Sequence, residues 1–196
     1  MRDMRILPAN DPEVPRVEAS GYVLVGESWG ARLRLSDPPD LSAIVPAVTR
    51  AEASGIAIRE LAEEYAEAVY QLELANHADY PVTPATTQPF PEREVIRQFW
   101  TSGKRVFGAI DGDFLVAVTV GQTENGVGDN DFASVLKEYR GRGVGAAVAA
   151  ASIIALARDG IRVFTAGGAA ANAASLGLAA SMGFVVEEQW RSYERI

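Results

Sequence analysis

The feature that most constrains this sequence is a glycine-rich, doubly basic turn, Tyr-Arg-Gly-Arg-Gly-Val-Gly, at residues 139–145. An apolar, strand-like run at 132–136 leads into the turn, and an alanine-rich apolar stretch follows it as far as Arg158. Glycines permit positive φ angles and remove the Cβ atoms that would block a ligand. The first N–H groups of a helix have no intrahelical partner, so a turn in this place favours an anion. The two arginines add donors that suit phosphate.

A solvated turn capped by basic residues is the plainer interpretation of the same stretch, because such turns are common in loops. One phosphate site can be excluded from the residues themselves. No Gly-Lys-Ser or Gly-Lys-Thr follows the glycines, and a P-loop nucleotide site needs that lysine and hydroxyl.

From residue 56 onward, the hydrophobic patterns predict an order of strands and helices that implies one fold class. In chain order the predicted elements are a strand at 56–61, helices at 62–76 and 91–100, strands at 105–110, 114–120 and 132–136, a helix at 144–158, a strand at 161–166, a helix at 173–182 and a strand at 185–194. Strands joined through a helix should be parallel, and strands joined by a hairpin antiparallel. We therefore expect an α/β (α+β) fold with a mixed, mostly antiparallel central sheet and helices on both faces.

Three connections carry further expectations. The residues Asp111-Gly112-Asp113 predict a hairpin turn. Polar residues and three glycines over 121–131 predict a mobile connection, and the prolines of 82–91 predict a long loop of the kind that covers sites. In the helix at 62–76, the periodicity assigns Glu73 and the other glutamates to the solvent side.

The first 55 residues are expected to form an extension rather than an independent domain, in front of a principal domain at 56–196. Prolines and scattered charges at 1–20 predict an extended arm. Two short strands are predicted at 22–25 and 31–35, and a short helix within 41–54. Their role is open between a cover over the acceptor cleft and a dimer contact.

Composition narrows the classes of function. A net charge of −8 argues against general nucleic-acid binding, which needs a basic surface to neutralise phosphates. The sequence has no cysteine, so disulfides, thiolate metal sites and cysteine nucleophiles are excluded. A single histidine, His77, leaves little basis for a metal site, and none is expected. No stretch is apolar and long enough to span a bilayer, and none reads as a signal peptide, so the expected location is the cytoplasm.

The residues around the turn resemble a known family. The run from Val135 to Gly145 is similar to the coenzyme A signature of the GCN5-related N-acetyltransferases, an Arg/Gln-x-x-Gly-x-Gly/Ala turn. Lys137 stands where this family usually has a proline. Further along, Asn172 opens a helix that closes with Gly183-Phe184, which resembles the family's second motif. The resemblance covers roughly residues 56–196 and is tight over 133–184.

The resemblance implies acetyl-CoA as co-substrate and assigns the residues that would hold it. Exposed backbone of the strand before the turn would pair with the pantetheine arm, the turn and the helix start would bind the pyrophosphate, and the second motif would line the other side. The residues implied are Ala133, Val135, Arg140, Gly141, Arg142, Gly143, Val144, Gly145, Ala146, Asn172 and Ser175. Asn172 is equally well explained as a helix N-cap, and both roles are compatible.

The groups that move protons are less defined by the sequence. The candidates are Asp131, Glu124 and Tyr139, each of which also fits a solvated or structural role. His77, Tyr80 and Tyr193 are further candidates with the same alternative. The family often has a tyrosine acid four residues before the glycine of its Gly-Phe, and Ala179 occupies that position here.

The sequence therefore favours an enzyme that transfers an acetyl group from acetyl-CoA to a primary amine of a small molecule or a peptide by direct attack. Its expected partners are acetyl-CoA and the amine acceptor, without nucleic acid or membrane, and a homodimer is left open. The alternative is a non-catalytic acyl-CoA-binding or regulatory module on the same fold. Ala179 keeps that alternative open.

Overall fold

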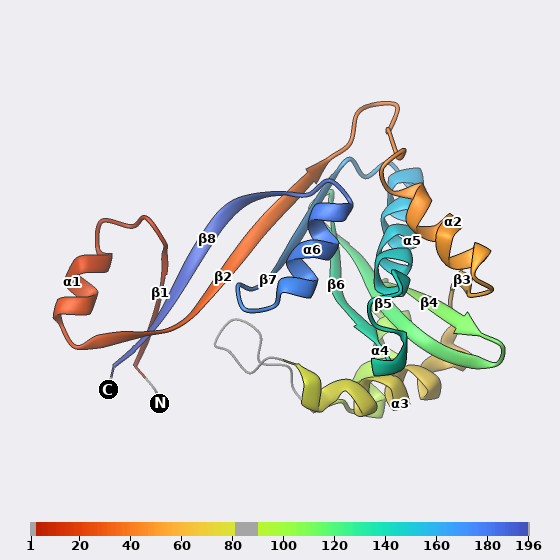
Figure 1. Cartoon of the computed structure of the whole chain (residues 1–196), viewed down its shortest axis with the longest axis horizontal. Helices are drawn as coiled ribbons and strands as arrows, with labels where there is room; N and C mark the ends of the chain where they lie inside the picture. Colours follow the sequence, from red (N-terminus) through yellow and green to blue (C-terminus); the bar gives the residue numbers. More distant parts are fainter. Residues whose placement is uncertain (1–2, 81–89, 196) are drawn as a thin grey trace.

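The computed structural model describes residues 3–80 and 90–195, and these form one eight-stranded sheet with helices on both faces (Figure 1). The strands are β1 (Met4–Pro8), β2 (Tyr22–Arg34), β3 (Ala57–Glu60), β4 (Arg105–Asp111), β5 (Phe114–Glu124), β6 (Val127–Val135), β7 (Val163–Ala169) and β8 (Val185–Arg195). The helices are α1 (Val14–Ala19), α2 (Val45–Ala53), α3 (Ala66–Asn76), α4 (Arg93–Thr101), α5 (Val144–Arg158) and α6 (Ala173–Ser181). Short 3₁₀ turns stand at η1 (Glu63–Tyr65), η2 (His77–Asp79) and η3 (Lys137–Tyr139).

The strand order is β1-β8-β2-β7-β6-β5-β4-β3. Every neighbouring pair is antiparallel except β6 and β7, which are parallel. This arrangement confirms the fold class predicted from the sequence.

Neighbouring residues of the central strand β5 show how the two faces are covered. Ala117 packs with Val144 and Val148 of α5. Val118 packs on the opposite face, in a cluster that includes Val69 of α3 and residues of α4. Successive side chains of a strand point to opposite faces, so α5, with α2 beside it, covers one face, and α3 with α4 covers the other.

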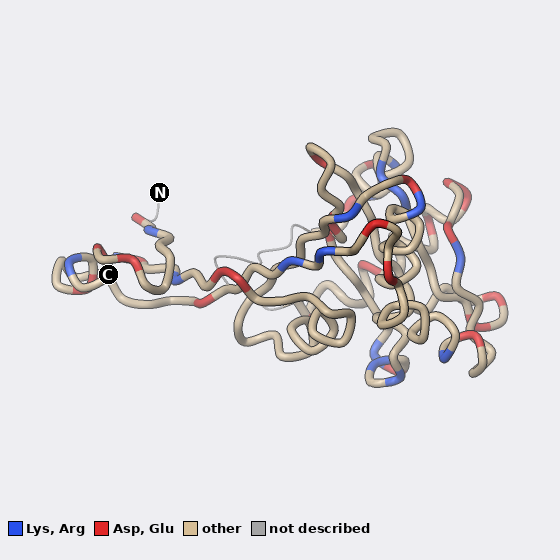
Figure 2. The backbone as a smooth tube through the Cα atoms, turned by 90° about the horizontal axis from the view of Figure 1, so that it is seen from above, with Lys and Arg blue, Asp and Glu red and all other residues tan. Residues whose placement is uncertain are grey.

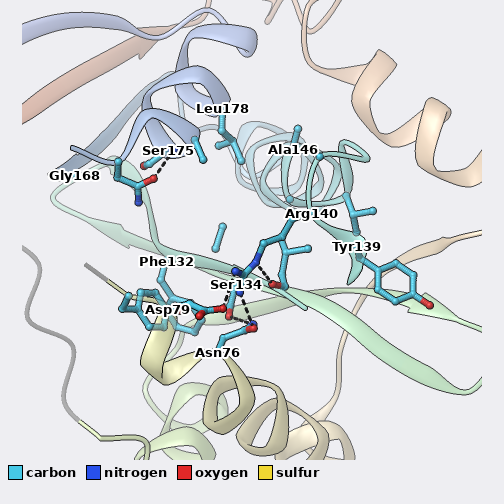
Figure 3. Close-up of a pocket in the computed structure, with 18 of the residues that line it drawn as sticks. Asn76, Asp79, Phe132, Ser134, Tyr139, Arg140, Ala146, Gly168, Ser175 and Leu178 are labelled. Atoms are coloured by element: carbon cyan, nitrogen blue, oxygen red, sulfur yellow. Dashed lines mark hydrogen bonds and ion pairs between the residues drawn. The ribbon is translucent and has the colours of Figure 1, made fainter. Parts of the chain in front are cut away.

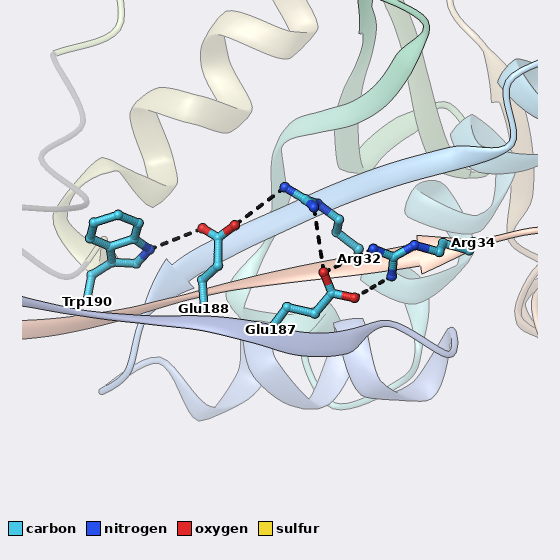
Figure 4. A network of polar contacts seen from close by, with 5 residues as sticks. All are labelled: Arg32, Arg34, Glu187, Glu188 and Trp190. Carbon is cyan, nitrogen blue, oxygen red and sulfur yellow. Dashed lines mark hydrogen bonds and ion pairs between the residues drawn. The ribbon is translucent and has the colours of Figure 1, made fainter. Parts of the chain in front are cut away.

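Strand β2 joins the N-terminal segment to the rest of the sheet. It lies between β7 and β8 and pairs antiparallel with both. On the side of β8, Arg32 and Arg34 form ion pairs with Glu187 and Glu188, and Trp190 donates to Glu188 at 3.2 Å (Figure 4). These ion pairs are exposed and contribute little stability. Burial of Trp29, which is 6% exposed in the core below α6, matters more.

Strand β1, helix α1, the beginning of β2 and the end of β8 form an arm that projects from the body (Figures 1 and 2). Both chain termini lie on this arm (Figure 1), and acidic and basic residues are mixed along it (Figure 2). A small separate core holds the arm together, in which Val14 and Val17 of α1 pack on Tyr22 and Tyr193.

Several predicted elements were wrong in detail. The two strands expected at 22–25 and 31–35 are one strand, because β2 has a hydrogen-bonded neighbour on each side and absorbs its irregularities as bulges at Leu24/Gly26 and Gly30/Ala31. The extended arm at 1–20 contains β1 and α1. The first turn of the helix expected from residue 62 is the 3₁₀ turn η1.

The mobile connection expected at 121–131 was also wrong. The segment is a tight hairpin, since β5 continues to Glu124 and β6 begins at Val127 opposite it. The two residues between them, Asn125 and Gly126, have φ angles of 50° and 79°, the conformation that an Asn-Gly hairpin turn requires. The loop expected at 82–91 falls mostly on residues 81–89, outside the described part of the chain.

We expect the replacement Trp29→Ala to destabilise the protein by about 3–5 kcal/mol, since it empties a large buried volume between β2 and α6. Urea unfolding followed by circular dichroism measures the change. Val25→Ala, on the same strand but 37% exposed, is the control and should cost about 0.5 kcal/mol or less. Equal effects of the two replacements would show that β2 is not part of the same core as α5 and α6.

Candidate functional site

The parallel strands β6 and β7 separate part-way along their length. They pair over three residues only, from Val127 with Val163 to Asp129 with Thr165. β6 continues to Val135 and stays paired with β5, while β7 continues to Ala169 and stays paired with β2. A wedge-shaped gap therefore opens in the middle of the sheet, with a supported strand on each side.

Backbone groups of β6 face into this gap. The N–H of Leu136 donates to the carbonyl of Val116 on β5. Since the direction of the backbone groups alternates along an antiparallel strand, the N–H and C=O of Ala133 and Val135 point away from β5 and into the gap. Unpaired backbone groups of this kind can pair with an extended, amide-containing ligand.

A cavity of about 550 Å³ occupies the gap (Figure 3). Its walls come from five parts of the chain: the second half of β6, the end of β7, the glycine turn with the start of α5, one side of α6, and the segment at the end of α3. Both motifs that carry the family resemblance, the glycine turn and the helix opened by Asn172, therefore meet at one site.

The glycine turn has the backbone geometry that its sequence predicts. Gly141 and Gly143 have φ angles of 74° and 79°, in the left-handed region that favours glycine. Gly143 is the residue before α5, and its carbonyl accepts the first helical bond, from Ala147. The N–H groups of Val144, Gly145 and Ala146 therefore have no helical partner and point out of the helix start.

Gly145 also lets the helix approach the sheet. A Cβ built on it would lie 3.1 Å from Val135 Cγ2 and 3.5 Å from Leu178 Cδ1. A larger residue would push α5 away from β6 and α6 and change the width of the gap.

The side chain of Arg140 is turned away from the glycines (Figure 3). Its Nε donates to the carbonyl of Val135 at 2.9 Å, its Nη2 donates to Asn76 Oδ1 at 2.9 Å, and its Nη1 lies 2.7 Å from Asp79. Asn76 is buried and donates in turn to Ser134 Oγ at 2.9 Å. Arg140 thus links the end of β6 to the end of α3. Ala133 and Val135 each direct an N–H and a C=O into the gap, and Arg140 occupies one of these four groups, the carbonyl of Val135.

The second arginine of the turn, Arg142, is exposed and has its guanidinium 5.1 Å from the ring centre of Tyr139. On the opposite wall, Asn172 is the N-cap of α6, because its Oδ1 accepts from the N–H of Ser175 at 3.1 Å. Both Asn172 and Ser175 also line the cavity, so the capping role leaves them beside a ligand. Ala179 is 2% exposed in the core under α6.

The three predicted proton-transfer residues are not brought together. Asp131 lines the cavity and is paired with Lys104 at 2.8 Å. Glu124 lies at the end of β5 beside the hairpin turn and is exposed. The hydroxyl of Tyr139 donates to Asp111 at 2.8 Å, and its ring points away from the cavity (Figure 3).

The other candidates have structural partners. His77 packs edge-on against Phe90, with ring centres 5.0 Å apart. Tyr193 is buried in the arm, and its hydroxyl donates to Glu18 at 3.1 Å.

The structure adds two acids that the sequence reasoning missed. Glu73, assigned to the solvent side of its helix, is half-buried against β6, and burial raises its pKa. Its spacing of three residues from the buried Asn76 was the signal, since positions three residues apart share one helix face. Asp129 lies where β6 and β7 part, near Gln122 and Thr165 at 3.4 and 3.3 Å, and burial raises its pKa as well.

Within the described residues, no group of three or more histidine, aspartate or glutamate side chains could hold a metal ion. In the same part of the chain, no helix combines the length and the apolar character needed to cross a membrane.

A comparison with protein-family models identifies the class of protein. Residues 59–184 match the acetyltransferase (GNAT) family, and these residues include the wedge, the glycine turn and the second motif. The chain belongs to the GNAT family. Members of this family are acetyltransferases that generally use acetyl-CoA and an acceptor substrate.

Solved structures of other GNAT proteins have the same fold. A GCN5-related N-acetyltransferase from Sphaerobacter thermophilus superposes with a TM-score of 0.73 at 19% identity, over 97% of this chain and 58% of that one. A tandem GNAT protein of the clavulanic acid biosynthesis pathway gives 0.63 at 18%, over 98% and 64%. A glucosamine N-acetyltransferase region in a fungal multi-domain β-N-acetylglucosaminidase gives 0.69 at 12%, over 96% and 24%.

At these identities the likeness concerns the fold alone. The chain spans about three fifths of the length of the Sphaerobacter protein. No curated protein sequence matches the chain.

We expect the replacement Asp129→Asn to stabilise the protein more at neutral than at acid pH. Because the folded-state pKa of Asp129 lies above its ordinary value of 3.8, its contribution to stability is fully present below that value and is lost as the pH rises through the raised pKa. The amide of the asparagine does not ionise, so the variant does not lose stability as the pH rises. The melting temperature of the variant minus that of the wild type should rise between about pH 4 and pH 7.

Thermal unfolding followed by circular dichroism measures this difference. Asp131→Asn is the matched control, since Asp131 is exposed and paired with Lys104, and it should show no such rise. A difference for Asp129→Asn that does not change with pH would contradict the burial argument.

Proposed function

We propose that this GNAT protein transfers an acetyl group from acetyl-CoA to a primary amine of a small molecule or a peptide, by direct attack of the amine. The observation that carries the proposal is the wedge between β6 and β7, whose free backbone leads to a positive-φ glycine turn at the start of a helix. The wedge suits the peptide-like pantetheine arm, and the helix start suits its pyrophosphate.

The residues that would hold the co-substrate follow from the geometry. Ala133 offers its N–H and C=O, and Val135 offers its N–H, since Arg140 occupies its carbonyl. The N–H groups at the start of α5 offer donors for the pyrophosphate. In this proposal Arg140 sets the position of the wall on the α3 side, and Arg142, free of any carboxylate within the described residues, supplies the positive charge.

The chemistry needs a neutral amine and a good alignment. As the amine nitrogen attacks the thioester carbonyl, a C–N bond forms and the C–S bond breaks with its electron pair on sulfur. No covalent enzyme adduct is required, which suits a chain without cysteine. The protein contributes by orienting the two reactants and by removing the proton of the amine. Of the two acids and one tyrosine proposed from the sequence, Asp131 has the best position, because it lines the cavity, whereas the ring of Tyr139 points away from it (Figure 3).

Ala179 favours a second candidate function, a non-catalytic acyl-CoA-binding module. The family often places a tyrosine there, and here the position is buried and apolar. A module of this kind would bind coenzyme A and its thioesters without consuming them.

The proposal extends to a cytoplasmic location, where acyl-CoA thioesters are available, and to a homodimer formed through the arm. Exposed apolar side chains on the arm support the dimer, with Ile6 at 53% and Leu24 at 47% exposure. Sedimentation equilibrium tests the oligomeric state, and a monomer at all concentrations would contradict it.

The test of the function has two measurements. Titration calorimetry with acetyl-CoA should show binding, and a panel of small primary amines and peptides, followed by release of free thiol, should identify acceptors that turn over. Binding without turnover across the panel would favour the non-catalytic module. Absence of binding at millimolar acetyl-CoA would contradict both functions.

We expect the replacement Gly143→Glu to lower the affinity for acetyl-CoA by at least about 100-fold, because it places a carboxylate against the pyrophosphate site. Gly126→Glu is a matched control, since both glycines have a φ of 79° and open space around the Cβ position. The control introduces the same backbone strain at the distant hairpin turn, and it should bind acetyl-CoA as the wild type does. Equal affinities of the two variants would contradict the pyrophosphate assignment.

A further inference from the structure

A small polar cluster lies under the wall of the wedge on the α3 side. Glu73 and Asn76 project from α3, and Tyr80 is the extended residue that follows η2. Opposite them, Ser134 projects from β6. Tyr80, Asn76 and Ser134 line the cavity, and Glu73 stands behind them on the helix.

The contacts within the cluster join the cavity to Glu73. The hydroxyl of Tyr80 donates to the carboxylate of Glu73, with its oxygen 3.1 Å from Oε2 and 3.4 Å from Oε1. Ser134 lies beside both the carboxylate of Glu73 and the hydroxyl of Tyr80, and its Oγ accepts from Asn76 at 2.9 Å. A proton on the cavity side of the Tyr80 hydroxyl is therefore one hydrogen bond away from a carboxylate.

The carboxyl of Glu73 is perturbed by its surroundings. Burial is the largest influence on its carboxyl and raises its pKa above the ordinary value, against the opposing hydrogen bonds of Ser134 and Tyr80. Burial likewise raises the pKa of Tyr80, so its hydroxyl keeps a proton and can only pass one on. A carboxyl group perturbed in this way beside a cavity is typical of sites that move protons.

The charged groups around the pair are largely neutralised. Asp79 is matched by Arg140 at 2.7 Å, Asp131 by Lys104 at 2.8 Å, and Glu67, on the outer side of α3, by Arg93 of α4. His77 is the first residue of η2, which precedes Tyr80. A positive charge on His77 favours the ionised form of Glu73.

We propose that Tyr80 and Glu73 form a proton relay for acyl transfer, an inference that rests on the proposed function. As the C–N bond forms, the amine proton passes to the Tyr80 oxygen while the Tyr80 proton passes to Glu73. The C–S bond breaks with its electron pair on sulfur, and the relay runs in reverse to protonate the thiolate. The proton lost by nitrogen is the one gained by sulfur, and both side chains return to their starting state. The relay supplies the acid that Ala179 cannot.

Two other carboxylates compete for this role. Asp131 lines the cavity but is paired with Lys104. Asp129 lies at the point where the strands part, and its partners are Gln122 and Thr165. Tyr80 differs from both because it lines the cavity and its hydroxyl already donates to an acid that stands behind it. Asp129→Asn therefore belongs in the experiment as the rival variant.

The test compares Tyr80→Phe and Glu73→Gln with matched controls on the same helix, Tyr70→Phe and Glu67→Gln. Tyr70 stacks under Arg93 at 4.1 Å, and Glu67 pairs with the same arginine away from the cavity. For each protein we would measure the affinity for acetyl-CoA by calorimetry, and kcat/KM against pH with the best amine of the panel.

We expect both relay variants to lose at least about 100-fold in kcat/KM, the usual worth of a positioned acid or base. Their acetyl-CoA affinity should stay within about threefold of the wild type, since neither side chain is assigned to that ligand. Glu73→Gln should also remove the acidic limb of the pH profile. The controls should match the wild type.

Three results would overturn the relay: a folded Tyr80→Phe or Glu73→Gln variant that keeps more than about a third of the activity, an acidic limb that survives in Glu73→Gln, or a limb lost in Asp129→Asn alone. Should Glu73→Gln fail to fold, Tyr80→Phe decides, because it keeps the ring and removes only the hydroxyl. A wild type that binds acetyl-CoA and acetylates no amine would overturn the proposed function together with the relay. An active wild type with unaffected variants would overturn the relay alone.

Discussion

The parting of β6 from β7 is the constraint on which the rest of this structure depends. Breaking a sheet in its middle leaves backbone donors and acceptors without partners, and such groups are costly unless water or a ligand satisfies them. The two strands can separate without fraying because each keeps a neighbour on its other side, β5 for β6 and β2 for β7. The gap is thus a stable part of the fold, and the binding site is built from hydrogen-bonding capacity that the sheet leaves unused.

The two sides of the gap are held in place by different contacts. On one side α5 packs closely, because Gly145 has no side chain to hold it away from Val135 and Leu178. On the other side Arg140 draws the end of α3 toward β6 through its contacts with Asn76 and Asp79. A residue that the family signature would assign to the ligand therefore acts here on the wall on the α3 side. The same wall carries the Tyr80–Glu73 pair, so the position of the proposed proton relay depends on the turn to which we assign the co-substrate.

The parts that the sequence predicted well are those encoded by neighbouring residues. The glycine turn, the amphipathic and alanine-rich helices and the Asp-Gly hairpin each depend on a few consecutive positions, and the structure contains them. The Asn125-Gly126 hairpin was encoded just as locally and was missed because the polar residues around it resemble a loop. The single strand β2 could not be read locally, because it depends on partners far along the chain, β7 and β8. The spacing of Glu73 from Asn76 is local, but the contact of Glu73 with β6 depends on Ser134, which lies far along the chain.

The place of β2 in the sheet has a consequence for the order of assembly. Leu33 pairs with Phe164 and Ala31 with Val186, so a strand near the beginning of the chain must wait for strands near its end. During synthesis, α3, α4 and the β4–β5–β6 hairpins can form from local contacts, while β2 stays without its neighbours until the last strands emerge. Contacts of such long sequence separation are slow to form. The wall of the wedge made by β7 and α6 is therefore expected to be completed late, and the site should gain its ligand affinity only after β8 has been made.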